Sequence, residues 1–233
     1  MFKQMFDKES STYTYLIVDD MTREAILIDP VVSHIEHYIN ELHLLNCDLK
    51  YSLETHVHAD HITASGLLRD RLSIKTGVSE LCGAKNADLQ LKDNDTLTSG
   101  SQQIKVIATP GHTSGSVSFL WNDRLFTGDA LLINGCGRTD FQGGDAAVLF
   151  RSITQKIFTL PDETLIYPCH DYNGKRVSCV AQEKAINPRL AGKSAKEFID
   201  IMNNLNLPKP KLIDIAIPAN RMCGVVEENI LQG

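Results

Sequence analysis

Short apolar runs alternate with polar turns along the chain and predict strands interspersed with helices. TYTYLIV (12–18) and REAILID (23–29) are rich in β-branched and aromatic residues, and the polar segment between them predicts a hairpin. Similar runs predict further strands at 50–55, 102–110, 116–121, 124–129 and 164–168. Strands mixed with helices in this way are typical of a layered α/β protein.

An apolar stripe at helical spacing follows the first hairpin. It consists of Val32, Ile35, Ile39, Leu42 and Leu45. This spacing predicts an amphipathic helix over 31–45. His34, His37 and His43 lie mostly off the stripe, so we expect them at the surface rather than in a metal site.

Four further segments are predicted to be helical. Asp145 stands where it can cap one of these helices, because its side chain can accept from the first turn. The predicted segments are 64–72, 146–158, 178–186 and 194–205. The tail after them contains prolines and is expected to be extended. We find no internal repeat and no linker, so residues 1–233 are expected to form a single domain.

Composition and charge exclude several classes of partner. The 233 residues are 42% hydrophobic and 22% charged, with a formal net charge of -6, which argues against nucleic acid or an anionic membrane as a partner. No apolar run approaches 18 residues, and the N-terminus does not resemble a targeting signal, so we expect a cytoplasmic protein. The six cysteines show no paired spacing and are expected to be free thiols.

The segment ETHVHADH (54–61) concentrates metal-ligating side chains at the end of a predicted strand. Residues two apart in an extended chain point to the same side, so His56 and His58 can face one point. Asp60 and His61 follow where the chain turns toward a helix and can face that point as well. This spacing predicts a metal site.

Three more ligand-type residues follow predicted strands: His112 in TPGHTSGS, Asp129 in FTGDA and His170 in YPCHDY. Each is a weak signal alone, but together with 54–61 they supply enough ligands for one or two ions. Imidazole and carboxylate without thiolate favour zinc or non-haem iron. The number of ions stays open at this point.

The motifs T-H-x-H-x-D-H, G-H-T and G-D, followed by a late histidine, resemble the metallo-β-lactamase superfamily. This resemblance implies an αββα sandwich with its metal site at one edge of the two sheets. GCGRTDFQGGD (135–145), IFTLPDETLIYPCHDYNG (157–174), NPRL (187–190) and NLNLPKP (204–210) are similar, more narrowly, to the persulfide dioxygenases, also called sulfur dioxygenases. The similarity extends over most of residues 55–224.

The narrower resemblance implies one non-haem Fe(II) per chain, held by His56, His112 and Asp129. Two histidines and one carboxylate leave positions open for a substrate sulfur and O2. His58, Asp60, His61 and His170 then orient ligands and water from outside, with Asp60 and His170 also assigned to catalysis.

The alternative is a binuclear thioester hydrolase of the glyoxalase II kind. In that arrangement His58 joins His56 and His112 at the first ion, while Asp60, His61 and His170 hold the second ion and Asp129 bridges the two. Two neighbouring ions suit hydrolysis. A third reading, a metal-binding regulatory protein without catalysis, is disfavoured by the complete ligand set.

The resemblance further implies that glutathione persulfide is oxidised with O2 and water to sulfite and glutathione, in a protein expected to be a homodimer. Arg138 is the candidate anchor for the substrate carboxylates, and an ion pair with Asp140 is its alternative role. Tyr172 is expected to aim its hydroxyl at the bound sulfur or oxygen, or else to bond a backbone group inside the protein. We expect Asp171 to be structural or to bond the outer nitrogen of a histidine. Cys136 is expected to be packed, with an oxidation-sensitive thiol as the alternative.

Overall fold

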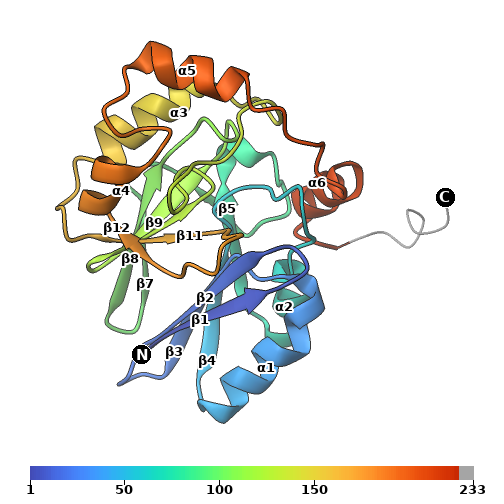
Figure 1. The fold of residues 1–233 in the computed structure, drawn as a ribbon. Coiled ribbons are helices and arrows are strands. Elements are labelled where there is room, and N and C mark those ends of the chain that lie inside the picture. The colour runs from blue at the N-terminus through green and yellow to red at the C-terminus, as the bar shows by residue number, and fades with distance from the viewer. Residues whose placement is uncertain (226–233) are drawn as a thin grey trace.

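A computed structural model describes residues 1–225 and shows two six-stranded sheets packed face to face (Figure 1). The first sheet runs in chain order through β1 (Phe2–Asp7), β2 (Thr12–Val18), β3 (Glu24–Ile28), β4 (Asp48–Leu53), β5 (Lys75–Ser79) and β6 (Leu89–Leu91). The second sheet has the reverse chain order, namely β12 (Ser178–Cys179), β11 (Leu165–Pro168), β10 (Arg124–Gly128), β9 (Val117–Trp121), β8 (Gln102–Ala108) and β7 (Thr96–Ser99).

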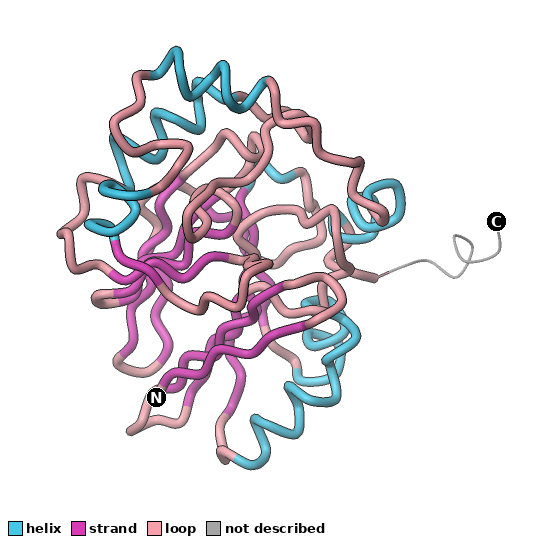
Figure 2. The backbone as a smooth tube through the Cα atoms, viewed as in Figure 1, coloured by secondary structure: helices cyan, strands magenta, loops and turns pink. Residues whose placement is uncertain are grey.

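Helices cover the outer face of each sheet, and the strands lie in the middle (Figure 2). The first sheet is covered by η1 (Val32–His34), α1 (Ile35–Leu44) and α2 (Ser65–Leu72). The second is covered by α3 (Ala146–Ser152), the π-turn η3 (Ile153–Ile157), α4 (Val180–Ile186) and α5 (Ala195–Asn203). A short 3-10 turn, η2 (Glu80–Cys82), follows β5, and α6 (Ile213–Arg221) ends the described chain. The predicted αββα sandwich is confirmed.

Strand β2 shows how the sequence produces these layers. Successive side chains of a strand point to opposite faces. Tyr13, Tyr15 and Ile17 pack between the two sheets, while Leu16 and Val18 pack under α1 and α2. Both faces of β2 are buried, which explains why TYTYLIV is apolar or β-branched throughout rather than alternating with charges.

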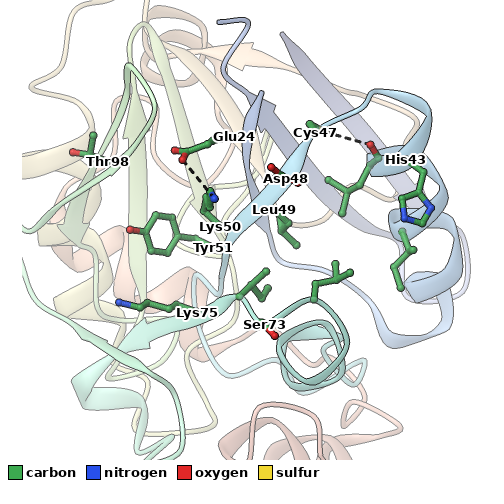
Figure 3. A pocket seen from close by; sticks show the side chains of 14 residues that line it. Glu24, His43, Cys47, Asp48, Leu49, Lys50, Tyr51, Ser73, Lys75 and Thr98 are labelled. Atoms are coloured by element: carbon green, nitrogen blue, oxygen red, sulfur yellow. Dashed lines mark hydrogen bonds and ion pairs between the residues drawn. The ribbon is translucent and has the colours of Figure 1, made fainter. Parts of the chain in front are cut away.

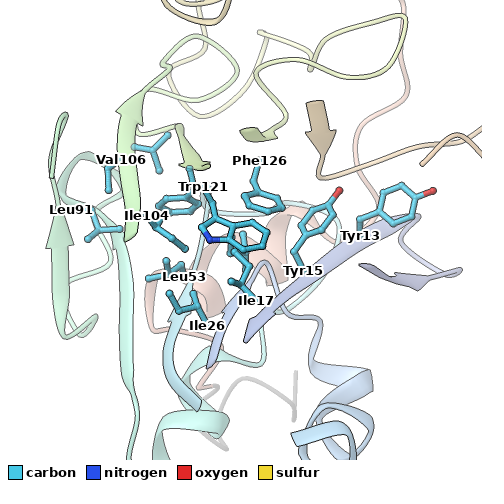
Figure 4. Packing of buried hydrophobic residues seen from close by; sticks show 13 residues of the cluster. Tyr13, Tyr15, Ile17, Ile26, Leu53, Leu91, Ile104, Val106, Trp121 and Phe126 are labelled. Carbon is cyan, nitrogen blue, oxygen red and sulfur yellow. The ribbon is translucent and has the colours of Figure 1, made fainter. Parts of the chain in front are cut away.

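The core between the sheets is aromatic (Figure 4). Tyr15 lies against Phe126 with 4.8 Å between ring centroids, and Trp121 and Ile104 fill the space toward β8. The hydroxyl of Tyr15 donates to the carbonyl oxygen of Pro168 at the end of β11, so this ring also joins the two sheets.

Most predicted elements are confirmed within a few residues. The hairpin of 12–18 and 23–29 is the antiparallel pair β2–β3, and Asp145 caps α3 by accepting from the backbone N–H of Val148. One helix was predicted two residues too long, because residues 178 and 179 pair with β11 as β12. No helix of the described residues is long and apolar enough to cross a membrane.

The prediction of an extended tail is wrong. Residues Ile213–Arg221 form α6 even though Pro218 stands inside it. A proline inside a helix removes one hydrogen bond and costs about 3 kcal/mol. Here burial outweighs that cost, because Ile213, Ala216 and Ala219 pack against the body and Asn220 is buried as well.

Candidate metal centre

The predicted ligands meet at one edge of the sandwich. β3 and β4 run parallel, as do β10 and β11, so the carboxyl ends of these strands open on the same edge. The 54–61 segment follows β4 there, and the turn carrying His112 follows β8. Asp129 follows β10 directly, after Gly128 with φ +53, and His170 lies two residues beyond β11.

His56, His112 and Asp129, the predicted iron set, lie close together. Their ligand atoms all lie within 4.8 Å of one another, and Nε2 of His112 is 3.5 Å from Oδ2 of Asp129. His56 is buried, whereas the other two are partly exposed. The set therefore has a buried side and an open side, as a site that admits a substrate requires. The assignment of these three as iron ligands stays a prediction.

Hydrogen bonds fix which nitrogen of each histidine faces the site. Nδ1 of His112 is 2.6 Å from the carbonyl oxygen of Arg138, so Nδ1 donates and Nε2 keeps its lone pair. Thr55 donates its hydroxyl to Asp29 and so accepts from Nδ1 of His56, which lies 3.0 Å away. Both rings thus present an unprotonated Nε2, the form that binds a metal.

The electrostatics of His56 agree with that tautomer. Burial lowers the pKa of His56 well below its ordinary value of 6.5, and the neighbouring imidazoles of His58 and His112 lower it further. A neutral imidazole is the form that ligates a metal ion.

Two buried polar atoms at this edge have no hydrogen-bond partner among the described residues: Oδ1 of Asp129 and Nε2 of His61. An unsatisfied buried polar atom costs about 1–3 kcal/mol, so native proteins rarely retain one without a reason. A carboxylate oxygen and an imidazole nitrogen are both metal-ligand atoms. The residues present therefore fit a bound cation.

The remaining predicted residues surround the first set. Nδ1 of His61 is 2.9 Å from Oδ2 of Asp60. Nε2 of His170 is 3.6 Å from Oδ1 of Asp60 and 3.8 Å from Oδ1 of Asp129. Nε2 of His58 faces two buried carboxylates, those of Asp29 and Glu54. The structure thus places all seven predicted residues at this edge. Within 4.8 Å it groups His56, His112 and Asp129 and, separately, His58, Asp60 and His61.

Several residues that fix this geometry were not predicted. Asp29 accepts from the backbone N–H and the hydroxyl of Thr55, and Glu54 accepts from Thr63 and Ser65. Glu54 stands inside the quoted ETHVHADH segment, so its position was a signal that we did not use.

Asn220 of α6 holds the loop that carries the ligands. Its amide nitrogen donates to the carbonyl oxygens of His58 (2.9 Å) and His61 (2.8 Å), and its amide oxygen accepts from the N–H of Thr63 (2.9 Å). More than 150 residues separate the two partners in sequence. The helix that sequence analysis missed is thus directly linked to the metal centre.

We expect Asn220→Ala to destabilise the protein by about 3 kcal/mol or more, because three buried backbone groups lose their partner. Urea unfolding measures this. Asn204→Ala is the matched control, since Asn204 is exposed and donates only to the carbonyl of Asp200. If both variants unfold at the wild-type urea concentration, the loop is not held by Asn220.

Arg138 forms an ion pair with Asp140, which was the alternative expected for it. Its guanidinium donates to both oxygens of Asp140, at 2.6 and 2.7 Å, and stacks on Phe141. It also donates to the carbonyl oxygens of Leu207 and Pro208, in the NLNLPKP segment. Its role as a substrate anchor stays a prediction.

Tyr172 does not bond a backbone group inside the protein, because its side chain is 72% exposed. Its ring stacks on that of His170 with 6.2 Å between centroids. Of the two roles expected for Asp171, the structure shows the structural one, because its carboxylate accepts from the N–H groups of Asn173 and Lys175. All six cysteines are free thiols.

Cys136 is packed, in agreement with the preferred interpretation. Its Sγ lies 3.6 Å from Sδ of Met202, and Arg189 donates to its carbonyl oxygen. Burial raises the pKa of the Cys136 thiol to about 11, which argues against a reactive thiolate.

A sizeable cavity lies away from these ligands (Figure 3). It has about 570 Å³ and lies at the opposite ends of β3, β4 and β5. Lys50 in its wall pairs with Glu24 at 3.5 Å, and Lys75 and Asp48 add charges of opposite sign. None of the predicted ligands lines it, so this cavity is not the metal centre.

Comparisons with known proteins agree with the geometry. The family model of the metallo-beta-lactamase superfamily matches residues 7–81 and 83–170. The proteins named "Persulfide dioxygenase ETHE1, mitochondrial" from Mus musculus and Homo sapiens are each 51% identical over 97% of this chain and 89% of their own length. The crystal structure of ETHE1 from Myxococcus xanthus has 55% sequence identity and a TM-score of 0.95, covering 97% of this chain and all of that one. The chain therefore belongs to the persulfide dioxygenase family of the metallo-beta-lactamase superfamily.

Proposed function

We propose that this protein is an iron-dependent persulfide dioxygenase that converts glutathione persulfide, O2 and water to glutathione and sulfite, with release of two protons. One observation carries the proposal: His56, His112 and Asp129 converge within 4.8 Å at an edge where an oxygen of Asp129 is left without a partner among the described residues. The relatives named as persulfide dioxygenases favour this activity over thioester hydrolysis.

Two histidines and one carboxylate are the set that holds non-haem Fe(II) in oxygenases, and this ion when bound supplies the electron that zinc cannot give to O2. The protein's own part is to hold that set rigid. The carbonyl oxygen of Arg138 keeps the proton of His112 on Nδ1, and Thr55 does the same for His56. Nε2 of both rings is thereby free for the ion.

The groups around this set supply polar contacts for the substrate and for protons. Asp60 accepts from Nδ1 of His61, which leaves Nε2 of His61 turned into the site as a proton acceptor. Tyr172 is exposed beside His170, so its hydroxyl is free to donate to a substrate that covers this edge. These roles are part of the proposal.

Two assays on one anaerobic preparation test the function. The protein loaded with Fe(II) should take up O2 with glutathione persulfide and form sulfite in equal amount. It should leave S-lactoylglutathione intact. Thioester cleavage without O2 uptake would establish the hydrolase alternative instead.

Arg138→Ala is expected to raise KM by about tenfold with a smaller change in kcat, if Arg138 pairs with a substrate carboxylate worth about 1.5 kcal/mol. Initial rates of O2 uptake at several substrate concentrations measure this. Asp140→Asn is the control, because it breaks the ion pair but keeps the guanidinium. Equal rises in KM for both variants would show that Arg138 only supports the loop.

We also propose a homodimer and a cytoplasmic location, as expected from the sequence. Light scattering of the purified protein tests the first, with a mass of about twice that of the chain as the expected result. The mammalian relatives are named as mitochondrial, so fractionation of the source cells tests the second.

A further inference from the structure

A buried thiol lies beside the metal centre and has no part in the function proposed above. Cys169 directly follows β11 and is fully buried, and its Sγ lies 4.0 Å from Nδ1 of His58. The ligand atoms of His58, Cys169 and His170 all lie within 4.8 Å of one another. All three residues are buried.

In His58 and in His170, one ring nitrogen is hydrogen-bonded to oxygen, and this contact orients each ring as a ligand. Nε2 of His58 is 3.2 Å from Oδ1 of Asp29 and 3.1 Å from Oε2 of Glu54. A nitrogen between two carboxylates carries a proton and donates it, so Nδ1 of His58, which faces the thiol, is the nitrogen available to bind a cation.

His170 is held in the same way. Its Nδ1 lies 3.2 Å from the carbonyl oxygen of Ser11, which can only accept, so the proton is on Nδ1. Nε2 of His170 is then the nitrogen that binds the cation, in place of a proton that the nearby carboxylates of Asp60 and Asp129 would otherwise hold there. Contacts of this kind, from a carboxylate or a carbonyl to the outer nitrogen, are the usual support of metal-ligating histidines.

We propose that His58, Cys169 and His170 form a second metal site, separate from the set of His56, His112 and Asp129, which takes a thiophilic divalent cation such as Zn²⁺. Two imidazoles and one thiolate are a ligand set that zinc prefers, with a fourth tetrahedral position left for water. Binding releases the thiol proton to the solvent and leaves a sulfur–zinc bond.

The observed spacing is close to what zinc needs. Bond lengths of about 2.3 Å to sulfur and about 2.0–2.1 Å to nitrogen place tetrahedral ligand atoms about 3.5 Å apart. The 4.0 Å between Sγ of Cys169 and Nδ1 of His58 therefore requires a contraction of about half an ångström. The predicted binuclear arrangement places its second ion on Asp60, His61 and His170, with Asp129 as the bridge. The proposed site shares His170 with it but differs in using the thiol of Cys169 and the imidazole of His58.

Zinc in this site is inhibitory, a consequence that rests on the proposed dioxygenase function. The rings of His56 and His58 are 4.1 Å apart between centroids, so the two sites are neighbours. A dication held by His58 and His170 fills the space beside the iron set and cannot itself change oxidation state. The thiol thus makes the enzyme sensitive to thiophilic cations without displacement of iron.

Spectroscopy of the metal-free protein tests the site without any assay of activity. Anaerobic titration with Co²⁺ or Cd²⁺ should produce a thiolate-to-metal charge-transfer band in the ultraviolet. Cys169→Ala should abolish the band, and so should Cys169→Ser, which preserves the size of the side chain. Cys136→Ala is the matched control and should retain the band, because Cys136 is equally buried but packs against Met202.

A band that persists in both Cys169 variants would overturn the proposal, and so would cation binding to the wild-type protein without a band.

A second measurement uses the iron-loaded enzyme. Zn²⁺ should inhibit O2 uptake while the iron stays bound, and Cys169→Ala should need at least about tenfold more Zn²⁺ for the same inhibition.

If Zn²⁺ instead releases the iron, and Cys169→Ala is as sensitive to Zn²⁺ as the wild-type enzyme, then the zinc binds in the iron set. That result would contradict the inhibitory role of the second site. The two proposals fail separately. If the iron-loaded enzyme takes up no O2 with persulfide, the proposed function is wrong, while the charge-transfer band still decides whether Cys169 binds a metal.

Discussion

Asp129→Ala is expected to lose its iron and, with it, all O2 uptake. Asp129 is the carboxylate of the proposed set, and its Oδ2 lies 3.5 Å from Nε2 of His112. Loss of a residue that merely orients a ligand costs 10–100-fold in metal affinity, so loss of the ligand itself should cost at least about 100-fold. Iron per chain after anaerobic purification, together with O2 uptake, measures this.

Asp214→Asn is the control for Asp129→Ala, because Asp214 is an exposed aspartate paired with Lys209. It should retain about one iron per chain and the wild-type rate. Retention of iron by Asp129→Ala would show that the ligand set has been assigned incorrectly.

The second large effect is expected for Gly137→Ala. The backbone of Gly137 passes so close to the ligands that an added Cβ would collide with the carbonyl oxygen of Asp129. It would also lie 2.7 Å from Nδ1 of His112 and 2.9 Å from Cβ of Asp129. We expect a loss of about 10–100-fold in iron affinity and of about 1–3 kcal/mol in stability, because both ligands must shift.

Gly135→Ala is the matched control two residues earlier. There an added Cβ would meet only Cβ of Leu132, at an ordinary 3.9 Å. Iron titration and urea unfolding of both variants separate a displaced ligand from a general effect of alanine in this loop. Equal iron affinity in the two variants would mean that the 135–138 loop does not position His112 and Asp129.

The candidate ligands could be recognised in the sequence because each follows a strand and stands in a short motif. His56 and His58 alternate along one extended segment, and a histidine or aspartate after a turn is visible without knowledge of the fold. The resemblance to the persulfide dioxygenases was then needed to choose among the possible reactions, because the spacing of the ligands alone did not distinguish them.

The supporting residues could not be recognised in the same way, because their contacts are distant in sequence. Asn220 bonds to residues 58, 61 and 63, and a buried amide in a late helix has no local signature. The helix itself was missed because Pro218 is a strong local signal against it, whereas the packing that outweighs proline is tertiary.

Some strands were also missed, because their sequences lack a clear pattern of apolar and polar residues or are too short to show one. β1 (Phe2–Asp7) is an edge strand with polar residues between its apolar ones, and β6 (Leu89–Leu91) and β7 (Thr96–Ser99) are only three and four residues long. Short edge strands depend on a neighbour for their hydrogen bonds. Their sequences alone therefore carry little signal.

A crystal structure of anaerobically purified protein, measured at the X-ray absorption edge of iron, tests the central claim most directly. We expect one anomalous peak per chain, bonded to His56, His112 and Asp129. Two peaks that share Asp129, with absorption edges of zinc rather than iron, would contradict a mononuclear iron centre.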